Sequence, residues 1–283
     1  MPPTRTNPIT SRFSHLAIYP AMYTLGVYLL ASLAMDLPQP DSVTIVFILL
    51  VANACYLLDR VKITNSRQDP ADALALPDRA LFFARNASPL RALLVVEFLF
   101  SIVLGYFISP LLAPIPLGAF IGVYLYAGRG ATPNDPRFKD LPALKSFFIA
   151  SAHLAFVIAV LWGNDHDLIA HPRAIVLWTL IGIWLIVSAD AIMCDLDDIH
   201  SDAIYATRSL PVLIGAQRAW AVAITAMLIG VLCLFIRHAF SLPLAMVSCL
   251  ILLSALPTRL RKNRRDLIDA RLLPIVLFGM LLR

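Results

Sequence analysis

Charged side chains are scarce in this sequence, where Asp, Glu, Lys and Arg together make up 14% of the 283 residues. Soluble globular domains carry about 25%. Hydrophobic residues reach 59%, and the mean hydropathy is +0.78. This balance excludes an ordinary soluble domain and predicts an integral membrane protein. The pI near 9.2 then indicates no nucleic-acid partner, because the Lys and Arg of membrane proteins gather in cytoplasmic loops.

Paired cysteines are also lacking. The four cysteines show no CxxC motif or other paired spacing, so no disulfide framework is implied. Glu97, the only glutamate, lies inside an apolar run, as does His153. Ionisable residues there are functional candidates. The alternative for Glu97 is a structural role, as a protonated side chain that is hydrogen-bonded to a neighbouring helix. His153 is either a core histidine whose hydrogen bonds are satisfied, which is the structural reading, or a cavity group near a substrate, which is the functional one.

Long apolar runs fill the sequence, and each is about the 17 to 25 residues that a membrane span requires. They predict an all-α integral membrane protein, a bundle of about nine transmembrane helices around a central cavity. Of the 23 basic residues, 20 fall in the segments that are cytoplasmic if the N-terminus is inside, so we expect the N-terminus on the cytoplasmic side. The runs lie near 13–35, 41–58, 89–109, 110–127, 145–163, 172–193, 218–236, 239–256 and, shorter, 272–282.

The spacing of the polar loops predicts one polytopic domain over 1–283 that contains two related halves. Loops 59–88 and 194–217 are long, rich in aspartate and four helices apart. We therefore expect tandem four-helix halves, about 13–127 and 145–256, plus a ninth helix. The two acidic loops would face each other across the cavity on the cytoplasmic side, most naturally that of a cell inner membrane.

Four aspartates stand close together in CDLDDIHSD at 194–202, directly after an apolar run. Asp195, Asp198 and Asp202 have the spacing i, i+3 and i+7, which on a continuous helix places them on one face. Three carboxylates at the mouth of a bundle suit Mg²⁺, which takes carboxylate, water and phosphate oxygens. Asp197 would point away and be solvated. The alternative for the three is a charged helix end facing water.

This pattern resembles the second aspartate motif of the UbiA-type membrane prenyltransferases. D-x-x-D-x-x-x-D is followed here by TRSLPV at 207–212 and by Gly215. The segments KDLPALKS at 139–146 and DARLLP at 269–274 are similar to further family segments. The resemblance covers most of the chain, and implies Mg²⁺-dependent transfer of a prenyl group from an isoprenyl diphosphate to an aromatic or other lipophilic acceptor.

Carried over by position, the resemblance implies that Asp195, Asp198 and Asp202 bind Mg²⁺ and, through it, the diphosphate. Lys145 and Arg208 match basic positions and become candidate catalytic residues that neutralise the leaving diphosphate. For Lys145 the alternative is an ordinary positive-inside anchor.

The family's first aspartate motif is degenerate in this sequence, which reads NACYLLDR at 53–60 and PDR at 77–79. Asp59 and Asp72 remain as candidate metal ligands. Asp59 also has a local explanation as an interfacial ion pair with Arg60, and Asp72 as part of a helix start. We expect basic residues of this loop to bind diphosphate oxygens directly, with Arg60, Arg67 and Arg79 as the candidates.

Three alternatives remain open from the sequence. Close relatives of the family cyclise the prenyl chain instead of transferring it. A membrane transporter would use Glu97 and Asp190 as relay carboxylates near the midplane. A non-catalytic relative would keep only the fold. The sequence does not specify the acceptor, the chain length or the oligomeric state.

Overall fold

The computed structural model describes residues 16–61, 77–127, 137–164, 172–204, 206–237, 241–260 and 264–283. Throughout these ranges the regular structure is helical, as expected from the sequence. The long helices are α2 (Ile18–Ala34), α3 (Ser42–Val61), α6 (Ala87–Ile108), α7 (Ile115–Ala127), α8 (Leu144–Gly163), α9 (Arg173–Asp195), α12 (Ala216–Arg237), α13 (Leu242–Ala255) and α14 (Arg264–Leu281). Shorter helices are α5 (Pro77–Arg85), α10 (Ile199–Ile204) and α11 (Leu210–Ile214), with 3₁₀ turns η2 (Phe138–Asp140) and η3 (Leu256–Leu260).

Each expected apolar run coincides with one of the long helices. Within the described ranges, six of them are long and apolar enough to cross a membrane by length and composition: α3, α6, α8, α9, α12 and α13, the last continued through η3. Helices α2 and α7 are apolar but shorter, with 17 and 13 residues. The polytopic membrane character is therefore supported, while the count of nine spans and the orientation of the N-terminus stay predictions.

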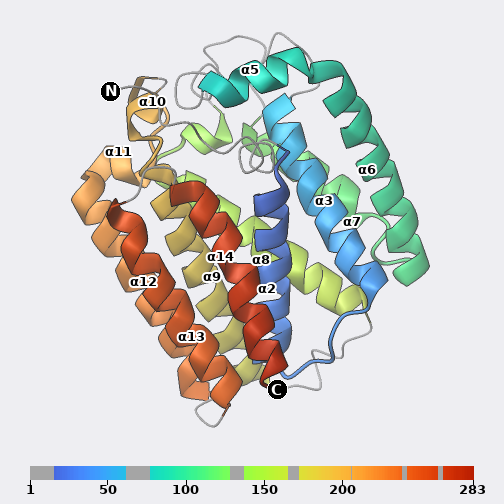
Figure 1. Cartoon of the computed structure of the whole chain (residues 1–283), viewed down its shortest axis with the longest axis vertical. Helices are drawn as coiled ribbons and strands as arrows, with labels where there is room; N and C mark the ends of the chain where they lie inside the picture. Colours follow the sequence, from blue (N-terminus) through green and yellow to red (C-terminus); the bar gives the residue numbers. More distant parts are fainter. Residues whose placement is uncertain are drawn as a thin grey trace.

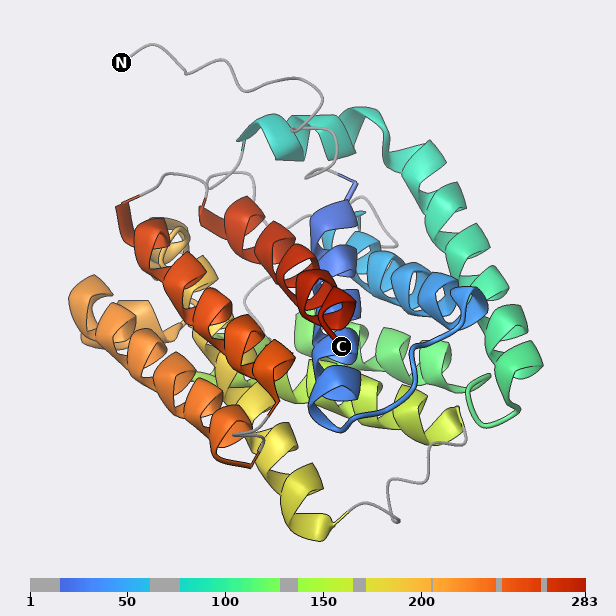
Figure 2. The same ribbon diagram turned by 60° about the horizontal axis from the view of Figure 1, so that its bottom comes forward.

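The helices form one bundle with α2 at its centre (Figure 1). Helices α3, α6 and α7 lie on one side, and α9, α12 and α13 on the other (Figures 1 and 2). Helices α2, α8 and α14 lie between these groups. Helices α2 and α8 pack against members of both groups, and α14 packs against α2, α9 and α13. The central position of α2 matches its composition, because 14 of its 17 residues are buried.

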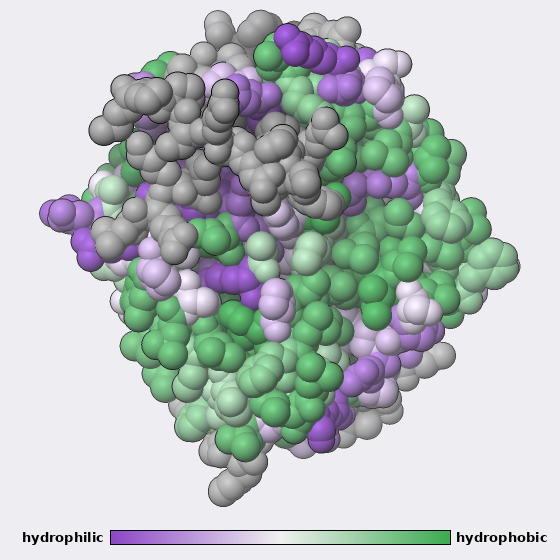
Figure 3. Space-filling view, viewed as in Figure 1, coloured by the Kyte–Doolittle hydropathy of each residue, from purple (hydrophilic) through white to green (hydrophobic). Residues whose placement is uncertain are grey.

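The outer faces of the bundle are strongly apolar. Figure 3 shows hydrophobic side chains covering the surface over α6 and over α12 and α13. On α6 these include Val96 and Phe107, with 62% and 77% of their surface exposed. Exposed apolar side chains on this scale are unfavourable in water and suit a lipid environment.

Two glycines set the close packing of α9 on α12. A Cβ added at Gly182 would lie 2.8 Å from the carbonyl oxygen of Gly230, and one added at Gly230 would lie 2.7 Å from the carbonyl of Gly182. Any larger residue at either position would force the two backbones apart. Such small residues allow the close helix contacts on which membrane bundles depend.

Candidate functional site

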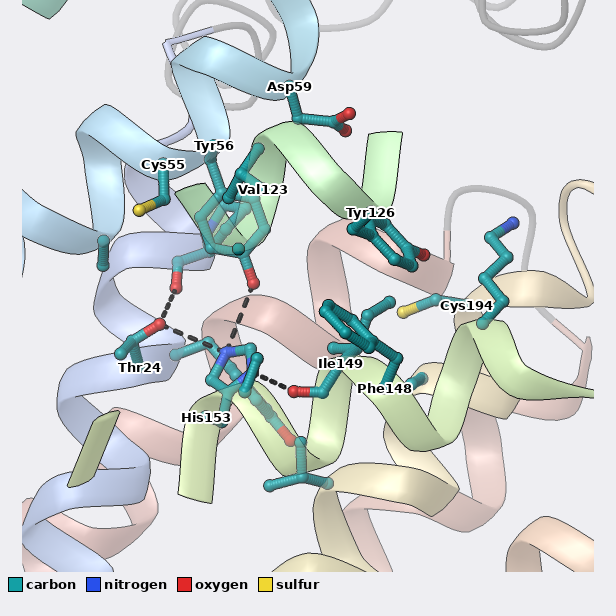
Figure 4. A pocket seen from close by; sticks show the side chains of 18 of the residues that line it. Thr24, Cys55, Tyr56, Asp59, Val123, Tyr126, Phe148, Ile149, His153 and Cys194 are labelled. Carbon is teal, nitrogen blue, oxygen red and sulfur yellow. Dashed lines mark hydrogen bonds between the residues drawn. The ribbon is translucent and has the colours of Figure 1, made fainter. Parts of the chain in front are cut away.

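A cavity of about 630 Å³ opens between α2, α3, α7, α8, α9 and α14. One end is charged and lies where α3, α8 and α9 meet the loops that the sequence analysis places on the cytoplasmic side. The rest is mostly apolar, and small residues of α7 and α8 form much of its wall. Figure 4 shows its interior, with aromatic and sulfur-containing side chains around it.

The three aspartates of the expected metal motif meet at one positive group. Nζ of Lys145 lies 2.8 Å from Oδ1 of Asp195, 3.4 Å from Oδ2 of Asp198 and 3.0 Å from Oδ2 of Asp202. The second oxygen of Asp195 accepts a hydrogen bond of 2.8 Å from Ser146, the residue after the lysine. The structure thus brings Lys145 and the three sequence-predicted ligands together.

The continuous helix expected over 195–202 is wrong. Helix α9 ends at Asp195, a turn follows, and α10 begins at Ile199. On a straight helix Asp195 and Asp202 would be about 10.5 Å apart along the axis. One ammonium group could not contact both carboxylates over that span. The turn shortens it, so the three side chains converge although they do not share one helix face.

Two arginines of α14 complete the charge balance at this end. Arg265 forms an ion pair with Asp198, and Nε of Arg264 lies 2.7 Å from Oδ1 of Asp197. The expectation that Asp197 is simply solvated is therefore incomplete, because it has its own cation. Arg265 was not predicted from the sequence. The only available signal was the basic segment RKNRR at 261–265, directly before α14.

These charges shift the titration of the aspartates in opposite directions. Burial acts to raise the pKa of Asp198, but Arg265 and Lys145 outweigh it and hold that pKa below its usual range. Burial raises the pKa of Asp202, and the negative charges of Asp195 and Asp198 add to the effect despite Lys145. Asp198 is therefore held in its ionised form more firmly than Asp202.

Among the described residues of the first loop, two candidates line the site and one does not. Asp59 and Arg60, in the last turn of α3, line the charged end of the cavity. Arg79 is buried in α5 and does not line the cavity, although its charge helps to lower the pKa of Asp198. The candidates Arg67 and Asp72 lie outside the described residues.

Arg208 does not join the cluster. Its side chain is exposed and does not line the cavity, while its backbone carbonyl accepts a 2.9 Å hydrogen bond from the amide of Ala143. Lys139, from the KDLPALKS segment, does line the charged end. The position that the motif assigns to Arg208 therefore contributes through its backbone, which tethers the loop before α8.

A buried polar link holds the two loops on either side of the cluster. Asp140 accepts hydrogen bonds of 2.9 Å from Nε of Arg137 and 2.7 Å from the hydroxyl of Thr207. Arg137 and Thr207 are buried, with 4% and 2% exposed. Burial acts to raise the pKa of Asp140, but the hydrogen bonds from Arg137 and Thr207 outweigh it and lower that pKa. This link fixes the start of α8, and hence Lys145, against the segment after α10.

Glu97 and Asp190, the two candidate relay carboxylates, both have polar partners within the bundle. Nδ2 of Asn53 lies 2.8 and 3.0 Å from the two carboxyl oxygens of Glu97, which is the expected bond between neighbouring helices, here α3 and α6. Asp190 pairs with Arg271 and accepts a 2.8 Å hydrogen bond from Tyr23. This ion pair across α2, α9 and α14 gives Asp190 a packing role and does not favour the relay of a transporter.

The donor set fits Mg²⁺ in its chemistry. Three carboxylates direct oxygen atoms at one position, which the ammonium group of Lys145 now takes. Oxygen ligands of this kind are those that a hard divalent cation prefers. Within the described ranges, no group of three His, Cys, Asp or Glu side chains stands ready-made around a metal position. Lys145 takes the central place, so a metal would share or replace its contacts.

The fold and site define an α-helical membrane protein with a charged, aspartate-rich mouth above an apolar cavity. No family model matches the sequence, and no curated protein matches it. Solved structures do. A UbiA homolog from Aeropyrum pernix K1 superposes with a TM-score of 0.64 at 15% identity, covering 94% of this chain and 98% of that one. One from Archaeoglobus fulgidus gives 0.62 at 16%, covering 95% and 98%.

A third similar structure is that of a digeranylgeranylglyceryl phosphate synthase, with a TM-score of 0.56 at 12% identity and 96% of each chain covered. The chain therefore has the UbiA-type fold over almost its whole length. The resemblance drawn from the aspartate motif is confirmed at the level of the fold.

Proposed function

We propose that this chain is a Mg²⁺-dependent prenyltransferase that moves a prenyl group from an isoprenyl diphosphate to a lipophilic acceptor and releases pyrophosphate. The observation that carries the proposal is the meeting of Asp195, Asp198 and Asp202 at Lys145, at the mouth of an apolar cavity. Support comes from two structures of the Archaeoglobus fulgidus homolog with Mg²⁺, one with GPP and one with DMAPP.

The residues divide the work along the cavity. Bound Mg²⁺ would be held by Asp195, Asp198 and Asp202, and would supply positive charge to the diphosphate as its C–O bond breaks. Lys145 would exchange its contacts with the aspartates for contacts with diphosphate oxygens. Arg60 and Lys139, which line the same end, would add direct contacts to these oxygens.

The cavity wall would protect the allylic cation formed when the diphosphate leaves. Rings of Tyr126 and Phe148 stack with centroids 4.8 Å apart and an interplanar angle of 9°, close to the charged end. Their faces can stabilise a nearby positive charge. The apolar walls beyond them exclude water, which would otherwise capture the cation.

The test is pyrophosphate release from purified protein in lipid nanodiscs with Mg²⁺ and prenyl diphosphates of one to four isoprene units. We expect release that needs Mg²⁺ and an added lipophilic acceptor. Release without any acceptor, with a cyclic hydrocarbon as product, would replace transfer by cyclisation. Absence of release with every diphosphate and a broad panel of acceptors would leave the non-catalytic alternative standing.

We further propose that the charged end faces the cytoplasm, as the distribution of Lys and Arg along the sequence predicts.

A further inference from the structure

A second polar group lies deeper in the cavity wall. It consists of His153 of α8, Thr24 of α2 and Tyr56 of α3, and Figure 4 shows their side chains meeting. His153 stands eight residues after Lys145, which is about 12 Å of rise along α8. Phe148 lies between the two on the same helix. The group is therefore separate from the aspartate cluster, with an aromatic surface in between.

One hydrogen bond fixes the tautomer of His153. Its Nδ1 lies 2.8 Å from the carbonyl oxygen of Ile149. A carbonyl can only accept, so Nδ1 carries the proton and donates it. In the neutral imidazole Nε2 is then an acceptor with a single lone pair, and this atom faces Thr24 and Tyr56.

The two hydroxyl groups satisfy Nε2 poorly. Oγ1 of Thr24 and the hydroxyl of Tyr56 each lie 3.3 Å from it, beyond the usual range for such bonds. The proton of Thr24 is already directed to the carbonyl of Pro20, at 3.1 Å. Tyr56 is left as the donor, through one long bond. A ligand hydroxyl in the cavity could make a shorter one.

We propose that Nε2 of His153 binds a hydroxyl group of a lipophilic ligand in the cavity, and that this contact makes His153 a specificity-determining residue for the acceptor. A prenyl chain has no polar atom, so it could not form a hydrogen bond with His153. Bound at this point, it would instead separate the imidazole from water without replacing the lost hydrogen bond. A ligand with a hydroxyl group on an apolar body fits both the acceptor nitrogen and the aromatic surface, with its hydroxyl on Nε2 and its apolar part toward Phe148 and Tyr126. That this ligand is the acceptor rests on the proposed function.

The experiment compares two probes that differ at one position, 2-naphthol and 2-methoxynaphthalene. Binding to the full chain in nanodiscs is followed by probe fluorescence, with empty nanodiscs subtracted for partitioning into lipid. We expect the wild type to bind the naphthol about five- to tenfold more tightly than its ether, as one added hydrogen bond allows. Equal affinity for the two probes would overturn the proposal.

Two cavity variants and one control variant assign the preference to one atom. His153→Phe should bind both probes equally, while His200→Phe, which changes an exposed histidine outside the cavity, should keep the preference. Tyr56→Phe removes the competing donor and should increase the preference. If His153 and Tyr56 had only structural roles, the preference for the naphthol should be lost in both cavity variants. Retention of the preference in His153→Phe would contradict the assignment.

A further measurement separates this inference from the proposed function. Binding of geranyl thiolodiphosphate with Mg²⁺ should be the same in the wild type and in His153→Phe. If the wild type fails to bind this analogue, the proposed function fails, while the naphthol preference still decides the ligand site. If the analogue binds and the naphthol preference is absent, only the present inference is wrong.

Discussion

Nζ of Lys145, at the start of α8, lies 2.8 Å from Oδ1 of Asp195, the last residue of α9. The pair is buried, with 13% and 3% of the two side chains exposed. Its partners Asp198 and Asp202 add negative charge at the same point. A protein cation therefore occupies the centre at which a metal would be expected to bind.

The first prediction concerns Lys145→Met. Removing one partner from a buried ion cluster leaves uncompensated charge, so the free energy of unfolding should fall by about 3–5 kcal/mol. Because the ammonium group no longer competes, Mg²⁺ should raise the Tm of the variant more than that of the wild type. Thermal unfolding with and without Mg²⁺ measures both effects, and Arg208→Met serves as the exposed control. An equal or smaller Mg²⁺ effect in the variant would show that lysine and metal do not share a position.

A second prediction distinguishes neighbouring aspartates. Asp198→Asn should reduce pyrophosphate release by at least about a hundredfold, because an ionised group contacted by both Lys145 and Arg265 is lost from the site. Asp197→Asn should change it less than about threefold, because Asp197 pairs with Arg264, away from the lysine. Steady-state kinetics at saturating Mg²⁺ compares the two variants. Similar losses would mean that Asp197 also acts in the site.

The pH dependence of the loop link gives a third prediction. The pKa of Asp140 is lowered by Arg137 and Thr207 against the effect of burial, so its contribution to stability is present above its unfolded pKa of about 3.9. That contribution is lost as the pH falls through the lower pKa of the folded state. Asp140→Asn should therefore cost about 1–2 kcal/mol at pH 7, and the difference from wild type should shrink below about pH 4. Unfolding in detergent from pH 7 to pH 3 measures this, and a constant difference would contradict it.

The width of the cavity beside α7 gives a fourth prediction. A Cβ added at Gly122 would meet no atom within 4 Å, and Ala155 of α8 also lines the cavity. Gly122→Leu should fill this space and lower kcat/KM about tenfold or more for diphosphates of three and four isoprene units, and less for one unit. The control Ile121→Phe places bulk at a half-exposed position outside the lining. Equal losses of kcat/KM for all prenyl lengths would mean that the prenyl chain does not bind beside Gly122.

Membrane topology is the fifth prediction. In a background without native cysteines, single cysteines at positions 65, 134 and 263 should react only with reagents admitted to the cytoplasmic side. A cysteine at Gln39, an exposed residue between α2 and α3, should react from the opposite side. Labelling of position 134 from the Gln39 side would reverse the predicted orientation of the charged end.

The sequence predicted the helices well, because apolar runs of spanning length have few alternatives. It also predicted that Asp195, Asp198, Asp202 and Lys145 share a site, since a motif with fixed spacing indicates which side chains come together, and in the structure these side chains do meet. It failed at the turn after Asp195. Helical periodicity describes the residues of one helix only, and it cannot include the effect of Lys145, a cation on another helix fifty residues earlier in the chain. Arg265 was missed for the same reason, and its pairing with Asp198 depends on how α14 packs. Arg208 was predicted to bring its side chain to the site, but in the structure only its backbone carbonyl makes a contact there, with the loop before α8.

The packing of α14 on α2 has a consequence for the order in which the protein matures. These helices are far apart in the sequence, yet α14 packs along α2 and brings Arg265 to Asp198. Chains fold during synthesis from the N-terminal side. Until α14 has inserted and docked, Asp198 lacks one of its two cations and the charged mouth lacks a wall. Newly made protein should therefore reach the charge balance of its mouth in one late step, so that the contact between Arg265 and Asp198 can serve as a marker that assembly in the membrane is finished.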